Sequence, residues 1–147
     1  MHVQGRRLIV RTVFALLALL GVCEASALAQ QPAVNTDPVA ALRSMKVIYV
    51  KSSSLLVGVS VIEEKLQRRA EFSQMGLVIT RDREVADVIL ELHHDILTKY
   101  VYTAIDRRTN VVLASGKLSS LGGTVAGKVA KRFLKQVMQA RATAPKT

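Results

Sequence analysis

The chain has 147 residues, 21 Lys and Arg against 11 Asp and Glu, and a formal net charge of +10. Half of its residues are apolar, and this length is typical of one domain. With no Trp and only three Phe and three Tyr, an aromatic core is excluded, and the core must be built mainly from Val, Leu, Ile and Ala.

The first 29 residues have the pattern of a secretory signal. Arg6, Arg7 and Arg11 form a positive start, residues 13–22 form a short apolar centre, and residues 27–29 (Ala-Leu-Ala) supply the small residues of a cleavage site. The apolar run is too short for a stable membrane anchor. We therefore expect a periplasmic or secreted protein after cleavage near Ala29. The alternative is an uncleaved helix that tethers the chain to the inner membrane.

Cys23 raises a second alternative, a lipid anchor. Residues 20–23 (Leu-Gly-Val-Cys) resemble a bacterial lipobox, but Val22 is bulkier than the small residue usual before the cysteine. The site at Ala29 fits better. Cleavage there leaves residues 30–147 with 18 Lys and Arg, 10 Asp and Glu and no cysteine. A disulfide framework and a cysteine-based metal site or nucleophile are then excluded together.

The next part of the chain predicts a leader, a strand and a helix. Residues 30–44 read as a flexible leader with a short helical turn that begins at Asp37-Pro38. Residues 45–51 predict a buried strand. A helix follows, with a capping box of Ser60 and Glu63, and Gly76 ends it. An earlier start is the alternative, since residues 55–59 could also be helical. We expect its core-facing residues at 62, 66 and 70.

The remaining chain predicts four strands and a second helix. The strands cover residues 77–80, 87–92, 99–105 and 111–119, and residues 106–110 (Asp-Arg-Arg-Thr-Asn) form a hairpin loop. The second helix covers 124–140, and residues 141–147 form a frayed tail. Its core-facing residues are Val125, Val129, Phe133 and Val137. The predicted fold is α/β (α+β): residues 45–140 form one domain with a single mixed β-sheet of about five strands. Its order is β-α-β-β-β-β-α, with two main helices packed on the sheet.

One segment matches the phosphate-binding loop pattern Gly-x-x-x-x-Gly-Lys, from Gly122 to Lys128. Val129 stands where that loop needs a Ser or Thr hydroxyl for magnesium. Too few residues follow Lys128 to form a strand with an acidic metal partner. We interpret Gly122 and Gly123 as a turn, and Gly127 as a residue that permits close helix–sheet packing. No cofactor is expected.

Two histidines are the strongest candidates for metal or acid–base chemistry. Strand alternation places Glu91, His93 and Asp95 on one sheet face, where they could form a row of ligands. We find no fourth ligand for a structural zinc site, so no metal site is predicted. His94 falls on the other face, where we expect it to be partly buried and hydrogen-bonded.

The sequence predicts no catalytic residues. No serine lies in a Gly-x-Ser-x-Gly elbow, and neither His93 nor His94 has a recognisable partner. Carboxylate pairs such as Glu63 and Glu64 look solvated. We therefore expect a protein that is not an enzyme.

Basic residues recur on one side of the second helix and at the hairpin tip. They are Lys128, Lys131, Arg132 and Lys135 on the helix, and Arg107 and Arg108 at the tip. Such a stripe could bind anionic lipid, lipopolysaccharide or anionic polysaccharide. Nucleic acid is a less favoured ligand because no stacking aromatics accompany the basic residues. An ordinary solvated helix face is the simpler interpretation.

Two segments carry a resemblance to known envelope domains. Residues 86–92 (Ala-Asp-Val-Ile-Leu-Glu-Leu) give an Ala-Asp-hydrophobic strand, and residues 102–116 give a hairpin with Asp and Thr in its turn. With the closing helix, this pattern resembles the amino-terminal domain of the Tol-Pal protein TolB. It also resembles domains of curli-secretion lipoproteins and penicillin-binding-protein activators. The resemblance spans about residues 45–138 and implies a non-enzymatic adaptor that binds other envelope proteins.

The sequence thus favours an accessory domain of the bacterial envelope that acts through protein–protein contacts. Exposed sheet edges could accept a partner strand. The alternative is a polyanion or membrane-surface binder that uses the basic helix Lys128–Lys135.

Overall fold

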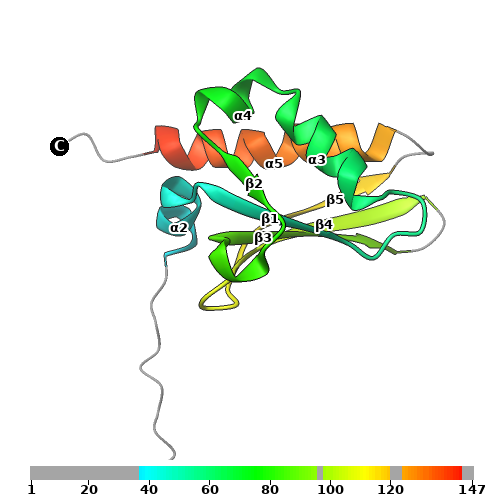
Figure 1. Ribbon diagram of the computed structural model, residues 1–147, viewed down its shortest axis with the longest axis horizontal. Helices are drawn as coiled ribbons and strands as arrows, with labels where there is room; N and C mark the ends of the chain where they lie inside the picture. The colour runs from blue at the N-terminus through cyan, green and yellow to red at the C-terminus, as the bar shows by residue number, and fades with distance from the viewer. Residues whose placement is uncertain (1–36, 96–97, 120–123, 144–147) are drawn as a thin grey trace, which may run out of the picture. The chain divides into compact units, whose positions relative to one another are not determined.

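A computed structural model describes residues 37–95, 98–119 and 124–143 (Figure 1). Its five-stranded sheet has the order β2-β1-β3-β4-β5. The strands are β1 (Val47–Ser52), β2 (Val78–Thr80), β3 (Val88–His94), β4 (Lys99–Asp106) and β5 (Val112–Ser119). The helices of the described residues are α2 (Pro38–Ser44), α3 (Val59–Gln67), α4 (Ala70–Gln74) and α5 (Val125–Ala142), with a 3-10 turn η1 (Arg83–Val85).

The sheet is mixed, as the sequence predicted. β1 pairs in parallel with both β2 and β3, and β3, β4 and β5 form an antiparallel meander. The parallel pair of β1 and β2 is connected by α3 and α4, since parallel strands need a crossover. The predicted fold class is confirmed, and α2 is the short helical turn predicted from Asp37-Pro38. α4 and η1 are additional short elements.

The helices cover one face of the sheet. α5 packs along α3, α2 and β5, and Figure 1 shows α3, α4 and α5 on the same side of the strands. The predicted core residues of α5, from Val125 to Val137 on one face, have no solvent exposure. The side chains of Val88, Leu90 and Leu92 are buried on the same side, so the predicted alternation of β3 is confirmed.

The single helix predicted from Ser60 to Gly76 is wrong in two respects. The helix begins at Val59 with Gly58 as its N-cap, so Ser60 lies inside the first turn and forms no capping box. The helix then breaks at Arg69, whose backbone is extended. The break turns Phe72 into the core and leaves Ala70 exposed, although a continuous helix would have buried Ala70.

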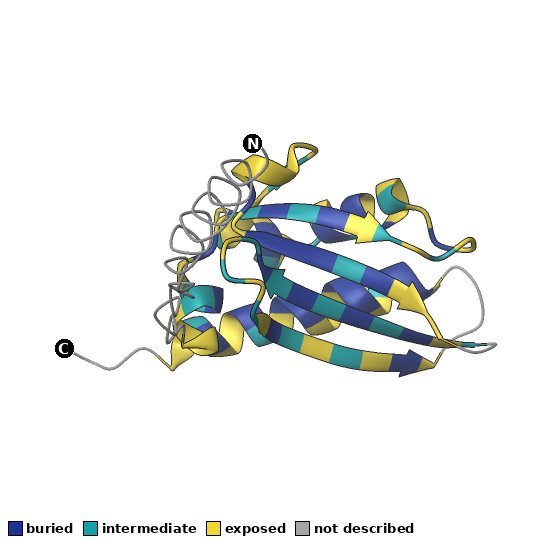
Figure 2. Ribbon diagram, turned by 90° about the horizontal axis from the view of Figure 1, so that it is seen from below, coloured by how far each residue is buried: buried dark blue, intermediate teal, exposed yellow. Residues whose placement is uncertain are grey.

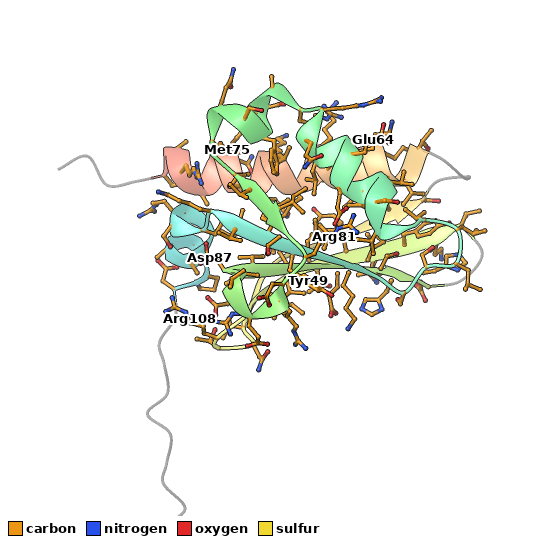
Figure 3. All side chains as sticks on the ribbon, viewed as in Figure 1. Tyr49, Glu64, Met75, Arg81, Asp87 and Arg108 are labelled. Carbon is orange, nitrogen blue, oxygen red and sulfur yellow. The ribbon has the colours of Figure 1, made fainter. Side chains whose placement is uncertain are left out.

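Asp87 joins β1 to β3. Its carboxylate Oδ2 accepts hydrogen bonds from the backbone N–H groups of Lys46 (2.8 Å) and Val47 (2.9 Å). Its own N–H donates to the Val47 carbonyl at 2.9 Å. The aspartate of the Ala-Asp pattern therefore fixes where the parallel pairing of β1 and β3 begins (Figure 3).

Two arginines link α2 to the end of α5. Arg43 Nε donates to the Ala140 carbonyl at 3.1 Å, and Arg141 Nη2 donates to the Met45 carbonyl at 2.9 Å. Arg141 Nη1 also reaches the Met75 carbonyl at 2.7 Å. Each guanidinium satisfies carbonyls at helix ends, which lack partners within their helices. α5 thus extends two residues beyond the expected end at Ala140, and Arg141 is part of it.

Gly127 does not have the packing role that the sequence suggested, which was to permit a close approach of helix and sheet. A Cβ built on it meets no atom within 4 Å outside its own helix and neighbours, so it permits no close helix–sheet approach. The motif's first glycines, Gly122 and Gly123, lie outside the described residues. Among the helices that the structure describes, none has both the length and the apolar character of a membrane span.

We predict that Gly127→Ala stabilises the protein by about 0.5–1 kcal/mol, because alanine restricts the unfolded chain and space for its methyl group exists. Urea unfolding measures this. Gly76→Ala is the matched control: Gly76 has a φ of +63°, where a Cβ costs roughly 1–2 kcal/mol. Equal destabilisation by both changes would contradict the prediction.

Gly116 of β5 lies under the ring of Tyr102. A Cβ at Gly116 would stand 2.5 Å from Tyr102 Cε1, and the ring cannot move aside freely. Tyr102 is buried, with 1% exposure, and its hydroxyl donates to Gln136 Oε1 at 2.9 Å. The same burial raises the pKa of the Tyr102 phenol.

We predict that Gly116→Ala destabilises the fold by ~1–3 kcal/mol, the usual cost of overpacking. A double-mutant cycle with Tyr102→Leu, followed by urea unfolding, isolates the clash. The cost of Gly116→Ala should shrink in the Tyr102→Leu background. Strictly additive effects would show that Tyr102 is not the cause.

Candidate interaction surfaces

One edge of the sheet is capped by side chains of α5. The outward carbonyls of Ser119, Lys117 and Ser115 on β5 accept hydrogen bonds from Lys128, Arg132 and Gln136, respectively. We call these three donors the edge-capping residues. They are four residues apart on the helix, while their acceptors are two apart on the strand. An exposed strand edge offers unpaired groups to another chain, and these donors already use the carbonyls of β5.

This arrangement changes the meaning of the predicted basic stripe. Lys128 and Arg132 have partners on β5, so half of the helix stripe serves the fold. Within the described residues, the ammonium groups of Lys131 and Lys135 have no hydrogen-bond or ion-pair partner, and both residues are exposed. The helix stripe is therefore a mixture of edge-capping and free cations.

The hairpin arginines do not join that stripe. Arg107 donates to the Ala86 carbonyl at 2.9 Å and to Glu84 at 3.2 Å. Figure 3 shows Arg108 at the end of the sheet near α2, whereas α5 begins at the opposite end. The six predicted polyanion-binding residues thus form two separate groups.

None of the α-helices that the structure describes covers the face of the sheet seen in Figure 2. Its register aligns Tyr49 of β1 with Ile89 of β3, Ile89 with Ile105 of β4, and Ile105 with Val112 of β5. We call these four residues the apolar row. Tyr49 and Ile105 are half-buried, Ile89 is buried with 3% exposure, and Val112 is 52% exposed. Figure 3 shows Tyr49 on the side away from α3 and α5.

A β-bulge makes this row possible. The pairing shifts between Ala104 and Ile105, so Leu113 is an extra residue on β5. Both Leu113 and Ala114 then pack toward the core, and Val112 is left on the open face. A regular strand would have placed Val112 and Ala114 on the same face.

Next to the apolar row lies a chain of polar side chains. Lys51 Nζ donates to Glu91 Oε1 at 2.9 Å, and His93 Nε2 is 3.2 Å from Glu91 Oε2. His93 Nδ1 is 2.8 Å from Ser53 Oγ. Sequence reasoning did not find Ser53 as a partner of His93, because Ser53 follows β1 and is far from His93 in the sequence.

A serine, a histidine and a glutamate in series also occur in hydrolases. Here Ser53 Oγ lies within reach of two acceptors, His93 Nδ1 at 2.8 Å and the Leu92 carbonyl at 3.2 Å, and the tautomer of His93 decides which of them receives the hydroxyl hydrogen. The contact with the Leu92 carbonyl ties Ser53 to β3 just beyond the end of β1. The hydrogen bond from Lys51 is the main reason that the pKa of Glu91 is lowered from its ordinary value of 4.5, and the bond to His93 adds to it against the effect of burial.

Two further side chains differ in burial from what the sequence suggested. His94 is exposed rather than half-buried, and its ring lies 4.7 Å from that of Tyr100. Among the described residues, no three His, Cys, Asp or Glu side chains are grouped so that they could hold a metal ion. Glu63 is buried and paired with Arg81 at 2.9 Å, although the sequence suggested a solvated carboxylate.

A polar cleft of about 690 Å³ lies beside α2, where Asp37, Asp87 and Asp106 meet Arg108. Its carboxylates already have backbone partners. Asp37 caps α2 through the Val39 N–H, and Asp106 accepts the N–H groups of Arg108 and Thr109 in the hairpin turn. The cleft therefore reflects three structural aspartates.

Comparison with protein-family models finds no match, and comparison with curated proteins finds none. Among solved structures, the chain is similar to a PelC dodecamer from Paraburkholderia phytofirmans, with 16% identity over 67% of this chain and 90% of that one and a TM-score of 0.35. It is also similar to a neuraminyllactose-binding hemagglutinin homolog from Helicobacter pylori, with 10% identity over 71% and 88% of the chains and a TM-score of 0.29. At such TM-scores, neither likeness bears on function.

The lowered pKa of Glu91 makes stability depend on pH. The carboxylate stabilises the fold fully above about pH 5, and this contribution disappears as the pH falls through the lowered pKa of the folded state. Glu91→Gln should therefore lose less unfolding free energy than the wild type between about pH 5 and pH 3. Urea unfolding across that range tests this, and Lys51→Met should act in the same direction. Identical slopes in all three proteins would contradict the assignment.

Proposed function

We propose that this protein is a non-enzymatic accessory domain of the bacterial envelope, and that its open sheet face binds another envelope protein. The apolar row carries the proposal. Four apolar side chains from four different strands lie in register on a face that no described helix covers. Val112 is the exposed member of the row, Tyr49 and Ile105 are half-buried, and Ile89 is buried between them. Apolar side chains on an uncovered face rimmed by polar groups are typical of a protein-binding site.

The edges of the sheet favour face binding over strand addition. The outward carbonyls of β5 are used by the edge-capping residues. At the other edge, β2 has only three residues, which gives a partner strand few hydrogen bonds. Val78 of β2 is 56% exposed and lies opposite Val47, so it extends the apolar surface instead.

The charge of the chain indicates the chemistry of the partner. Residues 30–147 have 18 Lys and Arg against 10 Asp and Glu, and many carboxylates of the described part are held by the protein itself, as in Glu63, Glu84 and Glu91. A partner with an apolar contact area and an acidic rim complements this surface. Export to the periplasm follows from the signal pattern of residues 1–29 and is part of the proposal.

The first test is site-specific photocrosslinking in native cells, followed by binding to the purified partner. A crosslinker at Val112 should capture one discrete envelope protein, whereas a crosslinker at Met138 should not. Met138 is a matched control because it is 45% exposed, close to the 52% of Val112, but lies on α5. Val112→Lys should then weaken binding of the purified partner about tenfold or more, and Met138→Lys less than about twofold.

Two results would contradict the proposal. Capture of the same protein at both positions would show that the open face is not the specific surface. Binding that survives Val112→Lys but collapses at moderate salt would indicate a polyanion site, because purely ionic contacts are screened.

A further inference from the structure

We propose that the loop between β1 and α3 docks on an anionic lipid surface, with Leu55 and Leu56 inserted at the headgroup level. This goes beyond the proposed function, because it uses a different part of the molecule. The observation behind it is exposure: Leu55 is 102% exposed and Leu56 is 69% exposed, although both are large aliphatic residues.

The loop is held in this conformation by the serines that precede the leucines. Ser52 Oγ donates to the Val57 carbonyl at 2.7 Å and accepts from the Ser54 N–H at 3.2 Å. Ser54 Oγ accepts from the Leu56 N–H at 3.2 Å. Such side chain to backbone bonds replace the bonds of a regular element and define a turn.

Both ends of the loop are also fixed to the body of the protein. The Ser53 N–H donates to the Leu92 carbonyl at 2.9 Å, and the Val57 side chain is buried with 4% exposure. Val57 thus points into the core while the two preceding leucines point out. The exposure of Leu55 and Leu56 is therefore imposed by hydrogen bonds and packing on either side. We call these two residues the leucine tip.

Cations lie at the same end of the sheet. The register places Ser52 level with Leu92 and Tyr102, so the loop leaves the sheet where β4 begins and β5 ends. Lys99 and Lys117 lie there and line a cleft of about 300 Å³ together with Asp95 and Ser119. Within the described residues, neither ammonium group has a hydrogen-bond or ion-pair partner.

This combination fits a lipid surface better than a protein groove. Two apolar side chains at the tip of a loop can enter the boundary between headgroups and acyl chains, and nearby lysines then meet anionic headgroups. The amino-terminal end of α5 also lies at this end, because Lys128 reaches the Ser119 carbonyl. Its partial positive charge adds to the attraction.

The test uses a tryptophan reporter, because the chain has no Trp of its own. The Leu56→Trp variant is purified in the form that the cell produces and is mixed with vesicles of phosphatidylethanolamine and phosphatidylglycerol. We expect a blue shift of its emission and quenching by brominated acyl chains. Val61→Trp, at a position 39% exposed on α3, should show neither. This local readout is independent of whether residues 1–29 are retained.

Vesicle partitioning of further variants tests the two components separately. Leu55→Ser with Leu56→Ser should weaken partitioning about tenfold or more, and Met138→Ser less than about twofold. Lys99→Gln with Lys117→Gln should weaken it about tenfold on phosphatidylglycerol vesicles and leave phosphatidylcholine vesicles unaffected.

Three outcomes would overturn the proposal. They are no blue shift of the emission of Leu56→Trp, equal blue shifts for tryptophan at residues 56 and 61, or vesicle partitioning that is lost in the lysine variant but not in the leucine variant. The last would indicate a soluble polyanion site. Val112→Lys should leave partitioning unchanged, so failure of this inference and failure of the proposed function can be told apart.

Discussion

The structure depends on the burial of α5 against one face of the sheet. The helix has buried residues at eight positions along its whole length, listed here in order: Val125, Ala126, Val129, Ala130, Phe133, Leu134, Val137 and Ala140. Burial of aliphatic and aromatic side chains is the main favourable term in folding. Other parts of the fold are attached to this helix. α3 packs beside it, the β5 edge is capped by it, and Arg43 and Arg141 connect its end to α2.

In the described part of the chain the α-helices lie on one face of the sheet, and none of them covers the other. The crossover through α3 and α4 and the closing helix α5 lie on the same side of the strands (Figure 1). Antiparallel sheets commonly have one solvated face, which is then polar. Here that face carries the apolar row beside a chain of polar residues from Lys51 to His93. The departure from a purely polar outer face is what makes this surface a candidate for binding.

Sequence patterns predicted most of the fold because the relevant signals are local. Alternation along β3 and the four-residue spacing along α5 each follow from the geometry of one element. The helix break at Arg69 carries no Gly or Pro, so it has no local signal. It follows from the burial of Phe72, which depends on packing against other elements.

The candidate surfaces were less predictable because they arise between elements. Helical spacing aligned Lys128 and Arg132, but only the pairing of α5 with β5 shows that their donors meet outward carbonyls. Likewise, the bulge that exposes Val112 is a property of two paired strands. The serine run at residues 52–54 directly follows the strand predicted at residues 45–51. Its further role in holding the leucine tip needed the partners of each hydroxyl.

Acidic and basic side chains have different roles in this protein. Asp37, Asp87 and Asp106 bind backbone N–H groups, so these acidic residues contribute to the fold. Several lysines, in contrast, have no partner in the described part, and two of them, Lys99 and Lys117, lie at the same end of the sheet as the leucine tip. A surface lysine without a partner makes no ion pair, so it contributes little to the stability of the fold. Their positions are therefore informative about binding: those near the loop complement an anionic surface, while the apolar row, farther along the sheet, provides contacts that salt does not screen.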